Sequence, residues 1–214
     1  MISPQLKELL LQSLEHERGG VLVYRTALEC AVNPQLRDEW ESYLEQTTNH
    51  VKVLTRVCEA LGLDPGERTP GCEVVHDTGK ALVLAMKKAL ASGNDAAAEL
   101  VACDSVVLAE TKDHANWELI GECAKVLNGD VGPVLSEAYA QVEDQEDEHL
   151  YHSKGWCREL WLQSLGLKAV IPPPEEREGV KTAIDAARVK QQSREDVGDS
   201  RSVSRERNGR ANIR

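Results

Sequence analysis

The sequence predicts an all-α protein, an antiparallel four-helix bundle with an extra short helix between the second and third long helices. Three observations support this prediction. The 214 residues contain no Phe, and Leu, Ala and Val predominate beside the good helix formers Glu, Gln and Lys. Apolar residues recur at the i, i+3, i+4 spacing of one buried helix face. The four long patterns begin at Ser, Asn or Pro start signals.

The first long helix is expected from Pro4, with Ser3 as its cap, to about Cys30. Its buried face carries one acid, Glu17, among apolar positions. The residues of that face are Leu6, Leu10, Leu14, Glu17, Val21, Tyr24 and Leu28. Gly19 and Gly20 follow directly, where each glycine costs about 1 kcal/mol relative to alanine. They indicate close packing or room for a small ligand, and simple tolerance of two glycines is the alternative.

The second long helix starts at the Asn33-Pro34 signal and ends at Gly62. Its face is the clearest in the chain: Leu36, Trp40, Tyr43, Thr47, His50, Leu54, Val57 and Leu61. His50 lies on this buried line, whereas Glu41 and Glu45 do not. A buried histidine alone is more often a hydrogen-bonded core residue than a metal ligand, so His50 needs support from the other helices.

A loop and a shorter helix are expected next. The triplets Asp64-Pro65-Gly66 and Thr69-Pro70-Gly71 read as turns. The following apolar pattern predicts a helix over about Asp77 to Ala91 that covers one side or end of the bundle. His76, at the edge of the loop, receives no role.

The third long helix is expected from a cap at Asn94 or Asp95 to about Leu127. Its inward line carries two acids, Glu110 and Asp113, three residues apart. The line as a whole is Ala102, Val106, Glu110, Asp113, Trp117, Ile120 and Ala124. An exposed acidic pair is the alternative, but apolar neighbours on the same line favour burial.

The fourth long helix is expected from Pro133 to Gly166, and it places a carboxylate and an imidazole on its core face. The face runs through Leu135, Ala138, Val142, Glu146, His149, Ser153, Trp156 and Leu160. A buried charge costs several kcal/mol unless it is paired or bound to a metal. Glu146-x-x-His149 therefore predicts partners inside the fold.

Residues 1–168 are expected to form the bundle, and residues 169–214 a mostly disordered charged tail with one weak helix over 181–190. The bundle region carries 15 Lys and Arg against 28 Asp and Glu, a net charge of −13. That charge argues against nucleic acid as a partner and suits cations. Six scattered cysteines without a Cys-x-x-Cys pair, no signal sequence and no membrane-length apolar run predict a soluble cytoplasmic protein.

The buried polar positions of the four helices together predict a metal site. They supply four carboxylates and two imidazoles: Glu17, His50, Glu110, Asp113, Glu146 and His149. Oxygen and nitrogen donors of this kind suit iron or manganese, with zinc possible, and side chains on facing helices of a bundle build such sites. A buried hydrogen-bond network, or acids that turn outward, is the alternative.

Several short motifs in order resemble the ferritin-like superfamily, in its rubrerythrin and YciE/YciF-like branch of bacterial stress proteins. Glu17 with Tyr24 is similar to the first-helix Glu-x6-Tyr, and residues 43–51 followed by Ala60-Leu61-Gly62 resemble the second helix. Gly71-Cys72-Glu73 resembles the connection of that branch, and Glu110-x-x-Asp113 with Trp117 its third-helix motif. Glu146-x-x-His149 is similar to the fourth-helix pair.

The resemblance implies two iron ions per chain, with manganese or zinc possible, that react with dioxygen or peroxide. Glu17 and Glu110 would be terminal ligands, Glu146 a bridge and His50 and His149 nitrogen ligands, with Tyr24 and Trp117 as protective neighbours. An external reductant and a homodimer would be the partners. Thr47 stands where the family has a second-helix bridging glutamate, and Asp113 is one methylene shorter than the usual Glu. Gln46, Thr47 or His114 could supply a further donor.

Two function classes stay open from the sequence. The first is a metal-binding oxidoreductase or peroxide-handling stress protein, favoured by the joint presence of the three glutamates and two histidines. The second is a non-catalytic helical bundle with a degenerate metal site that serves as an interaction or dimerisation module, favoured by Thr47. A storage cage is least favoured, by analogy only, because of the extra helix and the long tail.

Overall fold

Seven helices and no strand make up the part of the chain that the structure describes. This computed structural model describes the backbone of residues 2–210 and the side chains of residues 2–196. The helices are α1 (Pro4–Cys30), α2 (Pro34–Ala60), α3 (Pro70–Ala91), α4 (Asp95–Val126), α5 (Val131–Ser164), α6 (Pro174–Arg177) and α7 (Ala183–Arg210). The expected all-α class is confirmed. None of these helices is long and apolar enough to cross a membrane.

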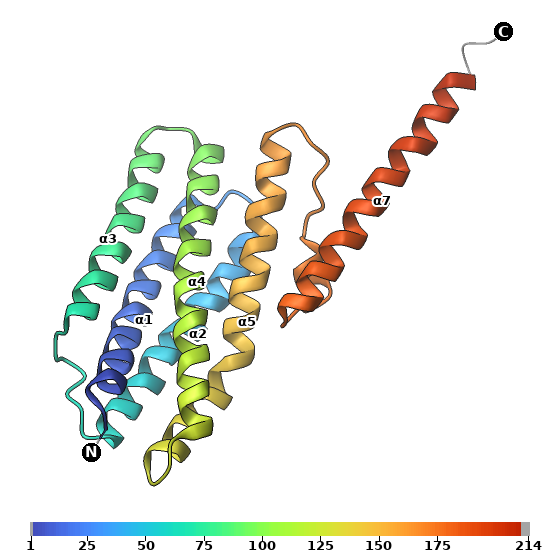
Figure 1. Ribbon diagram of the computed structural model, residues 1–214. Helices are drawn as coiled ribbons and strands as arrows, with labels where there is room; N and C mark the ends of the chain where they lie inside the picture. Colours follow the sequence, from blue (N-terminus) through green and yellow to red (C-terminus); the bar gives the residue numbers. More distant parts are fainter. Residues whose placement is uncertain (1, 211–214) are drawn as a thin grey trace.

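Four of the helices form a ring in which α1 packs on α2, α2 on α5, α5 on α4 and α4 on α1. Figure 1 shows that neighbouring helices of this ring run in opposite directions. Because α2 and α4 run the same way, the chain must cross the full length of the bundle between them, and α3 makes this crossing on the outside of α1 and α4. The antiparallel four-helix bundle with an extra helix before the third long helix is confirmed.

Three start signals read from the sequence act as helix caps, whereas the expected start at Pro133 is wrong: α5 begins two residues earlier, at Val131, without a side-chain cap. The Ser3 hydroxyl accepts from the Leu6 amide at 3.1 Å, and the Asn33 side chain accepts from the amides of Gln35 and Leu36. Of the two candidates at the start of α4, Asn94 is the cap, since its side chain accepts from the Ala97 amide. Each cap satisfies amides that have no partner within the helix.

The expected start of α3 is wrong. The helix begins at Pro70 rather than near Asp77, and it is therefore longer than expected. Thr69 accepts from the Cys72 amide at 3.3 Å, and Pro70 occupies the first helical position. The Thr69-Pro70-Gly71 triplet predicted a turn, but a hydroxyl residue followed by proline is also a common helix start. In the structure the triplet starts a helix.

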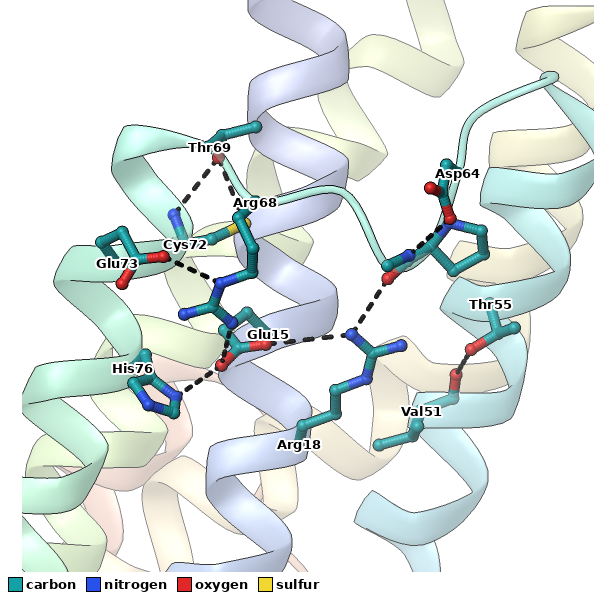
Figure 2. Close-up of polar contacts among 12 residues, drawn as sticks. Glu15, Arg18, Val51, Thr55, Asp64, Arg68, Thr69, Cys72, Glu73 and His76 are labelled. Carbon is teal, nitrogen blue, oxygen red and sulfur yellow. Dashed lines mark hydrogen bonds and ion pairs between the residues drawn. The ribbon is translucent and has the colours of Figure 1, made fainter.

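The first turns of α3 are tied to α1 through one carboxylate. The Glu15 side chain lies 2.7 Å from His76 Nδ1 and 2.8 Å from Arg68 Nη1 (Figure 2). Arg18, one turn later on α1, donates to the Pro65 carbonyl of the preceding loop. His76, without a role in the sequence reading, thus joins α3 to the bundle.

The segment after α5 returns along that helix. Pro173, Pro174 and Glu175 are buried, and the Glu175 carboxylate accepts two hydrogen bonds from Arg158 of α5, at 2.6 and 2.8 Å. The helix expected over residues 181–190 lies mostly within α7, which extends away from the bundle in Figure 1. The domain boundary at residue 168 and disorder beyond it stay predictions, and residues 211–214 of that tail lie outside the described part.

Two apolar clusters fill the bundle, with a polar layer between them. Glu17 of α1 lies between the two clusters: Leu6, Leu10, Leu11 and Leu14 of that helix belong to one, and Val23, Tyr24, Ala27 and Cys30 to the other. On α2 the order reverses, with His50 between Tyr43 and Val53. The apolar packing on both sides holds the polar layer at mid-bundle.

The two glycines of α1 have different surroundings. A Cβ on Gly19 would meet nothing within 4 Å, because Gly19 borders a mostly apolar cavity of about 250 Å³ between α1, α3 and α4. A Cβ on Gly20 would lie 3.2 Å from Thr47 Cγ2. The sequence left two explanations for these glycines, room for a small ligand and close packing. The structure has open space beside Gly19 and close helix packing at Gly20.

Gly19→Ala is expected to raise the free energy of unfolding by about 0.5–1 kcal/mol, because alanine removes the helix penalty of glycine without a clash. Gly20→Ala should gain less or destabilise, since Thr47 must shift to make room. Denaturant unfolding of the metal-free protein measures both changes. A loss of stability in Gly19→Ala would contradict the open space assigned beside it.

Candidate metal centre

The structure brings all six candidate ligands to the middle of the bundle. Every one of them is at most 3% exposed, and they come from all four helices of the ring: Glu17 from α1, His50 from α2, Glu110 and Asp113 from α4, Glu146 and His149 from α5. The helical periodicity that placed them on buried faces is thus correct. Their role as metal ligands stays a prediction.

One group of potential ligands joins Glu17, His50 and Glu146. Their donor atoms all lie within 4.8 Å of one another. His50 Nδ1 is 3.0 Å from Glu146 Oε1 and 3.5 Å from Glu17 Oε1. Three ligands around one point leave room for further ligands from solvent or substrate.

A second group joins Glu110, Glu146 and His149, again with donor atoms within 4.8 Å of one another. His149 Nδ1 lies 3.5 Å from Glu110 Oε2 and 3.8 Å from Glu146 Oε1. Glu146 belongs to both groups, and the rings of His50 and His149 stack with centroids 5.7 Å apart. The geometry therefore describes two adjacent three-residue sites that share one carboxylate.

Asp113 is buried beside these groups but belongs to neither of them. Burial, together with the charges of Glu17, Glu146 and Glu110, raises the pKa of Asp113 well above its ordinary value. A carboxyl group that keeps its proton is a poor metal ligand and a good hydrogen-bond donor. In the metal-free centre Asp113 therefore acts as a proton-bearing neighbour of Glu17.

Seven buried side-chain oxygen and nitrogen atoms of the six candidate ligands have no hydrogen-bond partner among the described residues. They are Glu17 Oε2, His50 Nδ1, Glu110 Oε2, Asp113 Oδ1, both Glu146 carboxylate oxygens and His149 Nδ1. Each unsatisfied buried polar group costs about 1–3 kcal/mol. Bound cations would satisfy these atoms together, so the residues present fit a metal centre.

Protons stabilise the metal-free centre in place of cations. Burial, with the charges of Glu17 and Glu110, raises the pKa of Glu146 to about 7. Burial alone would lower the pKa of His50, but the carboxylates of Glu17 and Glu146 raise it to about 11. Burial likewise opposes ionisation of Glu110, whose pKa is nevertheless lowered by His149. A metal that binds here must displace these protons.

Two glutamines orient the histidines, and the sequence reading assigned them no such role. His50 Nε2 is 2.7 Å from the side-chain oxygen of Gln145, and His149 Nε2 is 2.6 Å from that of Gln46. An Nε2 that donates to an amide oxygen leaves Nδ1 as the nitrogen that faces the carboxylates. The repeated Gln-x-x-x-His spacing, in which each histidine follows a glutamine by four residues, was the available signal.

Each half of the chain supplies an aromatic residue that lies beside a carboxylate of the other half. Trp117, seven residues after Glu110, donates from Nε1 to Glu17 Oε1 at 2.7 Å. Tyr24, seven residues after Glu17, is fully buried beside Glu110, and burial and that charge raise the pKa of Tyr24 well above its ordinary value. Glu17 with Tyr24 and Glu110 with Trp117 thus belong to two helical hairpins, α1–α2 and α4–α5, and the aromatic residue of each hairpin lies beside the other hairpin's carboxylate.

Three residues considered as extra donors have other contacts. Gln46 contacts His149, as described, and the methyl group of Thr47 faces Gly20. His114 Nε2 lies 2.7 Å from Asp147 Oδ1, on the solvent side of the centre. Among the described residues, Glu146 is the one that belongs to both groups of potential ligands.

A second buried polar cluster lies next to His149, and the sequence reading missed it. The Tyr43 hydroxyl and Trp156 Nε1 both donate to the Glu39 carboxylate, and His152 Nδ1 is 3.1 Å from the same carboxylate. The Tyr43 and His149 rings lie with centroids 4.2 Å apart. Tyr43 and Trp156 were read only as core residues, because the period of a helix does not reveal a hydrogen bond across the bundle.

Gln145→Ala is expected to lower metal affinity about 10- to 100-fold at the site that contains His50, since outer hydrogen bonds set the tautomer and direction of the ring. Gln46→Ala should do the same at the site that contains His149. Gln141→Ala, at an exposed position of α5, is the matched control. Titration calorimetry under anaerobic conditions measures the affinities, and equal affinities in all four proteins would contradict the orienting role.

Comparisons with known proteins add no relative. No protein-family model matches the chain. No curated protein and no solved structure matches it either.

Proposed function

We propose that the protein is a ferritin-like metal-binding protein that holds two iron ions, or two manganese ions, at mid-bundle. The observation that supports this most is the pair of ligand groups sharing Glu146, with seven buried polar atoms that lack a hydrogen-bond partner. Carboxylate and imidazole donors are the set that iron and manganese prefer, with zinc possible. The ring of four antiparallel helices with a crossing between α2 and α4 agrees with the proposal.

In this proposal Glu17 and His50 would hold one metal, Glu110 and His149 would hold the other, and Glu146 would be shared by both sites. Iron bound there would supply the electrons that reduce dioxygen or hydrogen peroxide. The chain orients both histidines through Gln46 and Gln145 and holds Glu17 through Trp117. The metal ions, a small oxidant and an external reductant are the partners, in metal handling or stress defence, and the homodimer stays a prediction.

A second candidate function is a non-catalytic bundle that has lost a working centre. Thr47, whose methyl group packs against α1, favours it, because a second bridging carboxylate is missing at that position. The protonated state of Asp113 favours it too, since one of the six candidates is then a weak ligand. The two functions differ in one measurable quantity, the amount of tightly bound metal.

Metal content measured by elemental analysis on protein purified without a histidine tag tests the proposal. Glu146→Ala and His149→Ala are prepared in parallel, and His76→Ala, a histidine outside the centre, is the control. The expected result is close to two iron or manganese ions per chain, both lost in Glu146→Ala, reduced to about one in His149→Ala and kept in the control. Consumption of peroxide or dioxygen by the ferrous-loaded protein then tests the reaction.

Absence of metal even after anaerobic ferrous loading would overturn the proposal and leave the non-catalytic bundle. Two bound metals without any reaction with either oxidant would keep the metal centre and remove the oxidoreductase function.

A further inference from the structure

A polar cleft opens beside the centre, between α4, α5 and the residues that lead into α7. It has a volume of about 250 Å³, and its lining includes His114, Glu118, Glu143, Glu146 and Asp147. A cation with roughly six waters, at about 30 Å³ each, fits into that volume. The cleft is thus wide enough for a hydrated metal ion.

The floor of the cleft belongs to the candidate metal centre. Glu146 lines the cleft although it is only 2% exposed, and both its carboxylate oxygens lack a hydrogen-bond partner. Trp117, which also lines the cleft, donates to Glu17. The shared carboxylate therefore connects the cleft to both groups of potential ligands.

The rim of the cleft carries side chains that could bind a cation transiently. His114 Nε2 lies 2.7 Å from Asp147 Oδ1, and His114 Nδ1 lies 3.8 Å from Glu118 Oε2. Glu143 lines the same rim. Four carboxylates on one cleft, counting Glu146, attract cations and raise their local concentration.

One cation of the chain itself lies at this rim. Lys181, just before α7, also lines the cleft, and its ammonium group is 2.9 Å from Asp144 Oδ2 and 3.2 Å from Glu148 Oε1. Its positive charge repels an approaching metal ion, and its two ion pairs hold the start of the C-terminal segment against α5.

The other cavity near the centre is unsuited to a cation. The cavity beside Gly19 is lined mostly by glycine and aliphatic residues, including Val23, Leu82 and Leu108, and it offers no carboxylate. An ion that loses water there would gain no carboxylate in exchange, and the ammonium group of Lys112 on the same lining would repel it.

We infer that divalent cations reach the buried centre through the cleft between α4 and α5, along Asp147, Glu143 and His114 to Glu146, and that Lys181 slows their passage. The inference rests on the proposed function, because it presumes a metal centre at the floor. According to this inference, Asp147, Glu143 and Lys181 change the rate at which the metal ion enters the centre and are not ligands of the bound ion.

The experiment mixes metal-free protein with Co²⁺ alone in a stopped-flow instrument and follows the ligand-field absorption of the bound ion. Asp147→Asn and Glu143→Gln each remove one negative charge from the rim, and Lys181→Gln removes the positive charge. Glu59→Gln, at an exposed position of α2, is the control for net charge. Titration calorimetry on the same proteins gives stoichiometry and affinity.

Asp147→Asn and Glu143→Gln should each slow loading about three- to tenfold, and Lys181→Gln should accelerate it by a similar factor. Added salt should reduce these differences. Stoichiometry should stay that of the unaltered protein in all variants, and the Glu59 control should load at the unaltered rate.

Equal loading rates in all variants, with Co²⁺ bound normally, would overturn the route and leave the metal centre standing. A lower stoichiometry in Asp147→Asn with an unchanged rate would make Asp147 a ligand and would also overturn the route. An unaltered protein that binds no Co²⁺ at all would overturn the proposed function itself.

Discussion

Glu146→Ala is expected to reduce the number of bound metal ions from two to none, whereas Glu17→Ala should leave one. The reason is that Glu146 belongs to both ligand groups and Glu17 to a single one. Without Glu146 each group keeps one carboxylate and one imidazole. Two donors are too few to displace the water shell of a divalent ion, since metal sites of this kind use three or more protein ligands.

Anaerobic titration with ferrous or cobalt ions, followed by elemental analysis, measures the stoichiometry. Glu146→Gln is prepared as well, because it keeps the shape of the side chain and removes the charge, so that a loss of metal cannot be ascribed to a cavity. Glu137→Ala, at an exposed position of α5, is the control. A single metal retained by Glu146→Ala, or none retained by Glu17→Ala, would show that the two groups do not share Glu146 as described.

Metal binding is expected to raise the melting temperature by about 10 °C. A ligand that binds only the folded chain at about 1,000 times its Kd contributes about 4 kcal/mol, and for a chain of this size each kcal/mol shifts Tm by about 2–4 °C. The gain should be large here because the centre contains buried polar atoms without a hydrogen-bond partner that a bound metal would satisfy. Scanning calorimetry with and without Co²⁺ measures the shift.

The thermal shift should increase with pH. In the metal-free fold the pKa of Glu146 is raised from 4.5 to about 7 and that of His50 from 6.5 to about 11. Between these values the folded chain holds protons that the unfolded chain has released, so the stability of the metal-free fold decreases as pH rises from about 4.5 to 11. Metal binding strengthens over the same range, because its ligands must lose those protons.

Melting temperatures measured with and without Co²⁺ at several pH values between about 5.5 and 8.5 test whether the thermal shift increases with pH. Glu146→Gln should show no shift with Co²⁺ and a flatter decline of stability with pH in its metal-free form. An unaltered protein whose melting temperature ignores Co²⁺ at every pH would contradict both the metal centre and its coupling to protons.

The departures from the resemblance become understandable in the fold. Thr47 stands where the resemblance implies a second bridging carboxylate, and its methyl group faces Gly20 of α1. A larger acid there would have to share the space in which α1 and α2 approach each other. The proposed centre would therefore combine one shared carboxylate with two histidines whose Nε2 atoms contact glutamines.

Helix period alone was enough to find the polar layer. Glu17, His50, Glu110 and Glu146 interrupt otherwise apolar faces, and a residue on such a face is buried wherever the helix packs on its neighbours. The start of α3 was misread because Thr69-Pro70 is compatible with both a turn and a helix cap. Only the contacts of Thr69 with the following turn decide between the two.

The sequence by itself determined the helical class, the four long helices and the six buried polar residues, because propensity, caps and the 3.6-residue period are local properties. The tertiary structure alone decided which polar atoms meet. Gln46 and His149 are 103 residues apart, and Gln145 and His50 are 95 apart. Their hydrogen bonds, the position of Asp113 outside both ligand groups and the acidic cleft depend on the rotation and crossing of packed helices. That arrangement results from the packing of the whole core, and no short stretch of sequence encodes it.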